Sequence, residues 1–182
     1  VFDAIHGPDR RDPTTVDVPF AYRHDQTLDG LRIGYLKSAF DEDYPGKEQD
    51  HEALRELRYL GVDLVPVEFP LAELGINPMD LAIILSAEAA AAFQDLTLSG
   101  RDDELVRQVR FAWPNVFRTA QFIPAVEYIQ ANRQRTLLME MMFDVFREVD
   151  VYLTPSLVGD SLLITNLTGH PQVVVPAGFT DE

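Results

Sequence analysis

The fold class is decided by LRIGYLKSAFDEDYPGKEQDHEALRELRYLGVDLVPVEF, residues 31–69. Residues 31–36 alternate apolar residues with small or polar ones, which is typical of a strand. Residues 47–60 place apolar side chains on one helical face, and Gly61 is suited to end that helix. Residues 62–69 form a second apolar run. A strand, a helix and a strand at this spacing predict two parallel strands joined by a right-handed crossover.

The rest of the chain continues this pattern. Pro66 lacks a ladder donor, so the second strand is expected at a sheet edge or bulged. The longest apolar pattern of helical spacing predicts a helix over residues 124–147. Residues 150–155 are predicted to form a third strand, and a loop over 156–165 is expected to lead to a fourth, buried strand at residues 173–175. The predicted class is α/β, with a partial mixed, mostly parallel sheet flanked by helices.

These elements favour one fragment of a larger domain rather than several domains. We expect an extended N-terminal segment over residues 1–30, a βαβ unit over 31–69, a helical region over 77–148 and a strand–loop–strand unit over 150–182. The chain begins at Val1 without a methionine or a leader, so we expect no signal peptide and regard it as a piece of a longer protein.

Composition excludes several classes of function. The net charge of −15 makes nucleic-acid binding unfavourable, because an acidic surface repels phosphates. No apolar run is long enough to predict a membrane span. The absence of cysteine excludes disulfides and thiolate metal sites, and it fits a cytoplasmic protein.

The most specific motif is NLTGHPQVVVPAG, residues 166–178, which sets glycine and proline at fixed intervals around a β-branched run. It resembles the late signature of the amidase signature family, N-x-x-G-x-P-x-x-x-x-P-x-G. Earlier segments resemble other patterns of that family in the same order: residues 3–13, 31–36, 125–135 and 150–156. The resemblance therefore extends over nearly the whole chain.

The resemblance implies a large α/β domain that cleaves or transfers carboxamides, as in stand-alone amidases and in the A subunit of the tRNA-dependent amidotransferase. Catalysis in the family uses a serine nucleophile, a second serine in a cis peptide bond and a lysine, with no cofactor. This chain has no Gly-Gly-Ser-Ser-Gly-Gly stretch and no Ser-Ser pair, and Lys37 and Lys47 lie outside the family's lysine context. No catalytic residue is assigned. We expect a scaffold that is inactive alone, within a parent that hydrolyses carboxamide C–N bonds.

The long helix and the loop before the late signature line the substrate pocket in this family. The resemblance therefore implies that Met142, Phe146, Leu163 and Thr165 contribute to the wall of a pocket for a small-molecule amide. Ordinary core packing is the alternative, since any half-buried helix needs an apolar stripe.

A Ser-His-Asp triad of Ser161, His170 and Asp160 is a weaker alternative. A triad is recognised by its geometry, which the sequence does not supply, and the chain lacks the G-x-S-x-G turn that presents such a serine.

A metal site at His6, Asp9 and Asp12 is also weak. These residues lie in a glycine- and proline-rich stretch, where aspartates usually cap their own turns. We therefore predict no metal.

The second functional hypothesis is a non-catalytic domain that binds a partner through its sheet edge or its aromatic residues. Exposed strand edges recruit other strands, so self-association or a homo-oligomer is expected under this hypothesis. The aromatic group consists of Phe111, Trp113, Phe117 and Phe122, and packing in the core is the favoured interpretation of it.

Overall fold

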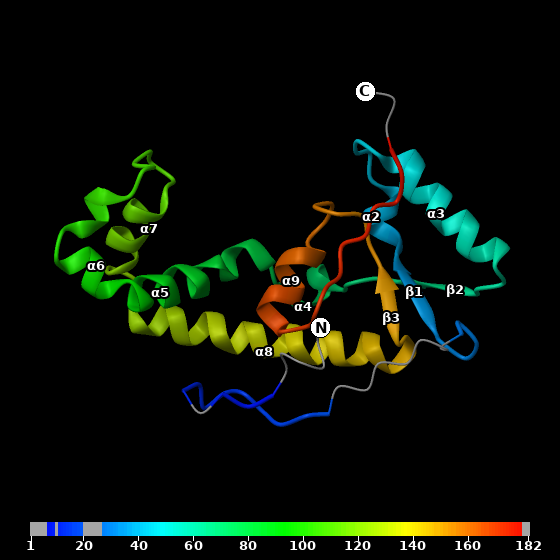
Figure 1. Cartoon of the computed structure of the whole chain (residues 1–182), viewed down its shortest axis with the longest axis horizontal. Helices are drawn as coiled ribbons and strands as arrows, with labels where there is room; N and C mark the ends of the chain where they lie inside the picture. Colours follow the sequence, from blue (N-terminus) through cyan, green and yellow to red (C-terminus); the bar gives the residue numbers. More distant parts are fainter. Residues whose placement is uncertain (1–6, 10, 20–26, 180–182) are drawn as a thin grey trace. The chain divides into compact units, whose positions relative to one another are not determined.

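The computed structural model describes residues 7–9, 11–19 and 27–179, and the chain divides into two units, residues 1–30 and 31–182 (Figure 1). The described part of the first unit consists of turns and extended chain. In it, Asp12 Oδ1 accepts a hydrogen bond from the Thr14 backbone N–H at 2.9 Å. This carboxylate caps its own turn, as the sequence predicts for an aspartate beside a proline.

The second unit is built on a three-stranded parallel sheet of order β2-β1-β3. The strands are β1 (Ile33–Leu36), β2 (Leu64–Val67) and β3 (Val151–Leu153). The predicted α/β class is confirmed, and Pro66 lies in an edge strand as predicted. Gly34 lies in the central strand, where an added Cβ would meet Val149 Cγ1 at 3.0 Å, so a larger residue there would displace the neighbouring side chains.

The connection between β1 and β2 contains α2 (Lys37–Asp41) and α3 (Lys47–Tyr59), which confirms the βαβ unit. Acidic residues occupy the first turn of α3 and Arg58 the last, in agreement with the helix dipole. Gly61 follows with φ +87°, a left-handed conformation that glycine adopts without strain.

Helices make up most of the chain between β2 and the C-terminus. They are α4 (Leu71–Leu74), η1 (Pro78–Leu81), α5 (Ala82–Ala92), α6 (Gln94–Leu98), η2 (Arg101–Glu104), α7 (Trp113–Ala120), α8 (Ala125–Glu148) and α9 (Ser161–Thr168). The sequence Asn77-Pro78-Met79-Asp80 is typical of an N-cap followed by proline at the first helical position. The structure confirms it, because the Asn77 side chain accepts from the Met79 N–H at 3.1 Å. Two short segments differ from what their sequences predict. Residues 113–115, Trp-Pro-Asn, are typical of a turn but begin α7, and the acidic run at 102–104 predicts a helix to about residue 110 but gives only the short η2.

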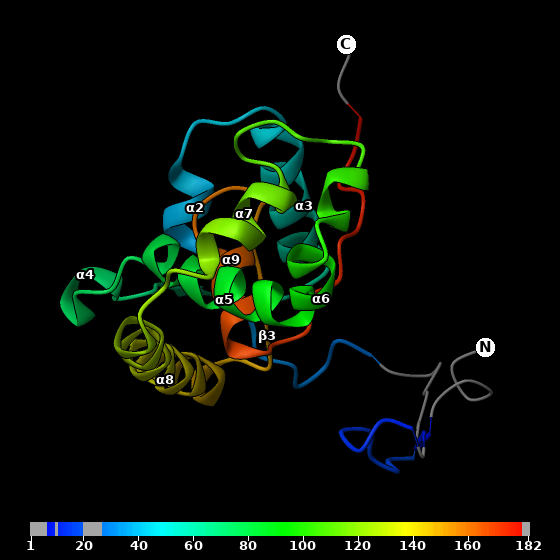
Figure 2. The same ribbon diagram turned by 90° about the vertical axis from the view of Figure 1, so that its left-hand side faces the viewer.

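The long helix α8 organises the larger core. Leu138 and Met142 are fully buried on it and pack with Leu81, Ile84 and Ile164. Helices α5 and α9 lie on the same side of α8 (Figures 1 and 2). Each end of α8 lies within one residue of the predicted end. The prediction succeeds because the apolar residues at helical spacing are the ones that pack in this core.

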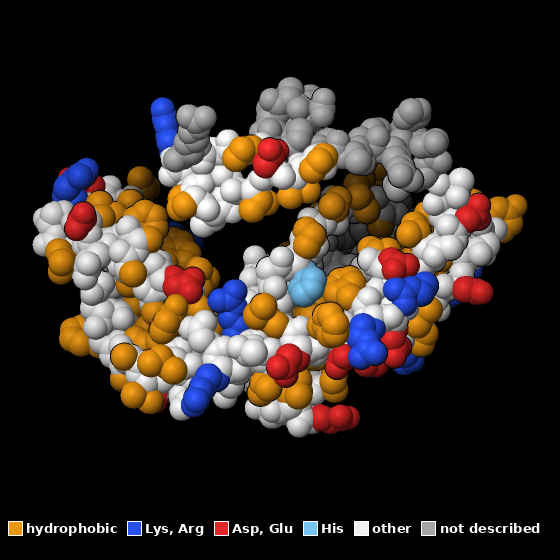
Figure 3. All heavy atoms as spheres, turned by 90° about the horizontal axis from the view of Figure 1, so that it is seen from below, with side chains coloured by type: hydrophobic (Ala, Val, Ile, Leu, Met, Phe, Trp, Pro, Cys, Tyr) orange, Lys and Arg blue, Asp and Glu red, His pale blue; other side chains and the backbone are white. Residues whose placement is uncertain are grey.

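The aromatic residues of the helical region are only partly in the core. The Phe117 ring is buried and stacks on Trp113 and Phe93, with centroids 5.6 Å and 4.9 Å apart. Phe111 and Phe122 are more than four-fifths exposed, which corrects the expectation of a core cluster for these two. Hydrophobic side chains accordingly gather at the left of Figure 3, over α5, α6 and α7.

The C-terminal part differs most from the prediction. Residues 161–168 form α9 instead of the predicted loop, and Gly169 ends the helix with φ +78°. Residues 170–179 adopt neither helix nor strand, and the valines at 173–175 are at least 70% exposed instead of forming a buried fourth strand. The strand–loop–strand unit predicted for 150–182 is therefore a strand, a helix and an irregular tail here. A β-branched run favours a strand, but it becomes one only beside a strand with which it can pair.

The start of β3 is fixed to the start of β1 by Arg32 and Asp150. Arg32 Nη2 lies 2.7 Å from Asp150 Oδ1, and the Arg32 backbone N–H donates to Asp150 Oδ2 at 2.8 Å. The Asp150 backbone N–H donates back to the Arg32 carbonyl at 2.8 Å. These bonds join residues 118 positions apart and hold the pKa of Asp150 below its usual 3.8, chiefly through the guanidinium hydrogen bond.

Replacement of Asp150 by asparagine tests this contact through its pH dependence. Because the folded-state pKa of Asp150 is depressed, the carboxylate stabilises the fold above its unfolded pKa and loses that effect as the pH falls through the folded pKa. We expect Asp150→Asn to lower the melting temperature at pH 7 and the difference from wild type to shrink below about pH 3.8. Asp63→Asn, at an exposed position, is the control. A difference that is constant with pH would contradict this role.

Candidate functional site

The four residues predicted to line a pocket meet where α8 contacts α9. Met142 is fully buried, and Phe146 and Leu163 are partly buried against the same apolar cluster. Thr165 is also buried, and its Oγ1 donates to the Ser161 carbonyl at 3.0 Å. The structure thus brings together residues from two helices that are separated by β3 and a loop.

These four residues differ in how much surface they offer to a ligand. Phe146 and Leu163 keep part of their side chains accessible, whereas Met142 and Thr165 are buried. Any pocket on this side of α8 would therefore touch Phe146 and Leu163 directly. Met142 and Thr165 would act by holding the wall in place, so pocket lining by all four stays a prediction.

His170 joins this group from the late motif. Its ring stacks on Phe146 with centroids 4.9 Å apart and planes 18° apart. Its Nδ1 lies 2.8 Å from Thr168 Oγ1, and its backbone N–H donates to the Thr165 carbonyl at 3.0 Å. The motif's Gly-His-Pro sequence gave no signal of the aromatic stack, which depends on the position of α8.

Tyr152 and Ser161 form a second polar contact behind this wall. Tyr152 Oη lies 2.9 Å from Ser161 Oγ, and Ser161 is buried. Burial raises the pKa of Tyr152, and the hydrogen bond with Ser161 partly offsets that effect. Tyr152 therefore keeps its proton at neutral pH and can donate it to Ser161.

The Ser161 and His170 side chains have separate partners, so within residues 27–179 the hydrogen bonds do not support the triad alternative. A serine is activated by a base within hydrogen-bond reach, and here Ser161 instead contacts a phenol.

The two lysines are engaged in local contacts. Lys37 is half exposed and pairs with Asp41 one turn along α2, a hydrogen bond that raises the Lys37 pKa. Lys47 Nζ donates to the Asp41 carbonyl at 3.0 Å. A lysine that acts as a base needs a lowered pKa, so the contacts of Lys37 do not favour that role.

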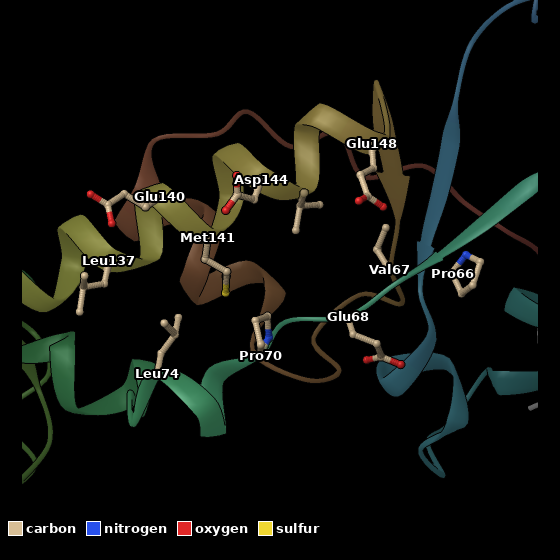
Figure 4. A pocket seen from close by; sticks show the side chains of 11 residues that line it. Pro66, Val67, Glu68, Pro70, Leu74, Leu137, Glu140, Met141, Asp144 and Glu148 are labelled. Carbon is tan, nitrogen blue, oxygen red and sulfur yellow. The ribbon is translucent and has the colours of Figure 1, made fainter.

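A groove lies on another face of α8, where β2 and α4 run opposite it (Figure 4). It has a volume of about 420 Å³ and combines an apolar floor with glutamate and aspartate side chains. None of the four predicted pocket residues lines it. The sequence contains a pattern that corresponds to this groove but was not used to predict it. Apolar residues recur at 137, 141 and 145 of α8, and acids recur at 140, 144 and 148.

The described part of the chain contains neither a cluster of metal ligands nor a helix that could span a membrane. Within residues 7–9, 11–19 and 27–179, no group of three histidine, aspartate or glutamate side chains could hold a metal. His6 lies outside those residues, so the His6 alternative is not described. None of the described helices is both long enough and apolar enough to cross a membrane.

Comparison with known proteins identifies the family. The Amidase family model matches residues 1–177. The chain belongs to the Amidase family. The resemblance noted in the sequence is thereby confirmed, and it extends through the late motif as far as Ala177.

Its curated relatives are longer proteins. An amidase of Pseudomonas putida is 31% identical over the whole chain, which covers 44% of that protein. The A subunit of the glutamyl-tRNA(Gln) amidotransferase of Prochlorococcus marinus is 27% identical, again over the whole chain and 46% of that protein. The chain thus spans about half the length of the curated relatives it matches.

A solved structure shares the fold with a TM-score of 0.62 and 24% sequence identity, over 85% of this chain and 32% of the other. It is described as the inhibitor-bound form of a vestigial protein complex connected with the origins of an s-triazine catabolic enzyme. At this identity the likeness shows the fold alone.

Proposed function

We propose that the whole protein is an amidase that hydrolyses the C–N bond of a linear carboxamide to give an acid and ammonia or an amine. The observation that carries the proposal is the Amidase family match over residues 1–177. The relative from Pseudomonas putida, itself an amidase, supports hydrolysis as the reaction.

In this proposal the residues of the present chain are scaffold and pocket wall. A serine nucleophile needs a base beside it and preorganised donors for the oxyanion. The sequence has no pair of adjacent serines, and the pairing of Lys37 with Asp41 favours its charged form. The nucleophile and base are therefore assigned to the rest of the protein, and this chain is expected to be inactive alone.

The proposed wall consists of Phe146 and Leu163 at its surface, with Met142 and Thr165 behind. Two observations support it: these residues converge where α8 meets α9, and the late motif enters the same place through the stack of His170 on Phe146. An apolar wall of this kind suits the acyl chain of a small-molecule amide.

The reaction is tested with the intact protein and a panel of short- and long-chain primary amides and benzamide. We expect ammonia and carboxylic acid in equal amounts, measured by coupled assay and chromatography. The polypeptide of residues 1–182, tested beside it, should release none. Absence of hydrolysis by the intact protein over the whole panel would contradict the reaction, and ammonia from residues 1–182 would contradict the scaffold role.

The wall is tested by Phe146→Ala and Met142→Ala in the intact protein. Each removes apolar volume at the wall, so kcat/KM for long-chain relative to short-chain amides should change about tenfold or more, the scale of small differences in an apolar pocket. Phe143→Ala is the matched control, because Phe143 is an exposed neighbour on α8. An unchanged chain-length profile in both variants would remove these residues from the pocket.

An amidotransferase A subunit is the second candidate, favoured by the similarity of the whole chain to the A subunit from Prochlorococcus marinus. It predicts that glutamine is the preferred amide and that its hydrolysis rises when partner subunits are added. A non-catalytic partner-binding role and self-association through a strand edge also stay predictions. A cytoplasmic location is part of the proposal and is supported by the cysteine-free composition.

A further inference from the structure

The groove between α8 and the β2–α4 segment has an apolar floor with contributions from both sides. Leu137, Met141 and Val145 stand four residues apart and therefore share one face of α8. From the opposite side come apolar residues that include Pro70 and Leu74. Figure 4 shows Met141 pointing from α8 toward these two residues, so the floor is continuous across the groove.

The rim of this groove is acidic. Glu140, Asp144 and Glu148 also stand four residues apart on α8, beside the apolar row, and Glu68 lies on the opposite side just after β2. Figure 4 shows Glu148 directed from the end of α8 toward β2. The residues that line the groove include no lysine or arginine.

Cations outside the lining act on part of this rim. Glu68 adds to the effect of Asp41 in raising the pKa of Lys37, and Glu148 adds to that of Asp150 in raising the pKa of Arg32. The described ion pairs include one of the four acids, Asp144, which lies 3.7 Å from Arg147 Nη1, and both side chains are about 70% exposed. Such an exposed pair is weak. The lining itself carries four acids and no base, so the groove keeps a negative potential around Glu140 and Asp144, above a floor that is unfavourable to leave in water.

A second hollow extends the apolar surface on the outer side of α8. It has a volume of about 540 Å³ and includes Met139 and Phe143, and it shares Glu140 and Asp144 with the groove. Acids thus separate two apolar areas. A ligand that fits both must carry apolar groups on either side of positive charges.

We propose that this groove docks a basic amphipathic helix of a partner protein, with leucine-like anchors on the floor and lysine or arginine side chains over the rim. From Leu137 to Glu148 the groove follows α8 for roughly 17 Å, about three helical turns, which suits a helix in a groove. Charge complementarity identifies the occupant: a second copy of this chain, with net charge −15, would be repelled. The continuous apolar floor favours a peptide over a small polyamine.

The test uses the intact protein and a fluorescein-labelled 18-residue helix of leucine and lysine at amphipathic spacing. Its counterpart carries glutamate at every lysine position. Fluorescence anisotropy is expected to show binding of the lysine peptide, weaker at higher salt, and no binding of the glutamate peptide. This readout does not depend on amide hydrolysis, so its failure and failure of the proposed function are distinguishable.

Variants locate the binding on the protein. The triple variant Glu140→Gln, Asp144→Asn, Glu148→Gln should weaken binding of the lysine peptide about tenfold, the sum expected of three exposed charge pairs. A control triple, Glu56→Gln, Asp95→Asn, Glu127→Gln, changes net charge equally at exposed positions away from the groove and should leave binding unchanged.

The floor is tested separately by Leu137→Asn, which should also weaken binding because it removes an apolar contact without changing charge. Leu137 is 41% exposed, so the protein tolerates a polar residue there better than at Met141. Three results would overturn the proposal. The first is that the lysine peptide does not bind the intact protein, which would mean that another part of the protein fills the groove. The second is that the control triple variant weakens binding as much as the groove variant does. The third is that equimolar spermine displaces the lysine peptide completely.

Discussion

The parallel pairing of β3 with β1 is the constraint on which the rest of the second unit depends. Arg32 and Asp150 close a segment of 118 residues with a guanidinium–carboxylate contact and with backbone hydrogen bonds in both directions. Closing so long a loop costs conformational entropy, and the cost rises slowly with length. Gly34 and the fully buried Val149 add the close packing that such a junction requires. The segment that connects β2 to β3 must therefore begin and end at points whose separation is fixed by the sheet.

The consequence for α8 is a fixed direction. The helix ends at Glu148, and only Val149, which is buried, and Asp150 separate it from the start of β3, so the sheet restrains its direction. One face is directed to the core with α5 and α9, where Met142 and Phe146 lie. Another face is left opposite β2 and α4, where the groove forms. The two candidate surfaces of this chain thus lie on different faces of one helix, and Met141 contributes to both the groove and the core behind the wall.

The sequence was sufficient to predict the elements whose structure depends on neighbouring residues. The βαβ unit, the Asn77 cap, α8 and the edge position of Pro66 follow from spacing, capping and a missing donor. The valines at 173–175 were predicted as a strand because β-branched residues favour one, but a strand also needs a neighbour. The helix α9 was not predicted for a related reason. Residues 156–165 were assigned to a loop, and the last residues of α9 belong to the late motif, which was assigned to a strand.

The candidate sites were predictable to different degrees. Met142, Phe146, Leu163 and Thr165 came from resemblance to the family, and the structure brings them together because α9 packs on α8. The stack of His170 on Phe146 and the groove could not be predicted, since both depend on where distant segments lie. The acidic row at 140, 144 and 148 is visible in the sequence, but it predicts only a solvated face until β2 and α4 are placed opposite it.

The proposal as a whole requires that the attack on the amide is made by residues outside the present chain, with this chain contributing the proposed pocket wall. The most direct measurement is reaction of the intact protein with a fluorophosphonate probe, followed by proteolysis and mass spectrometry to locate the adduct. The account predicts one modified serine, outside residues 1–182. An adduct on any serine of this chain, Ser161 included, would contradict it.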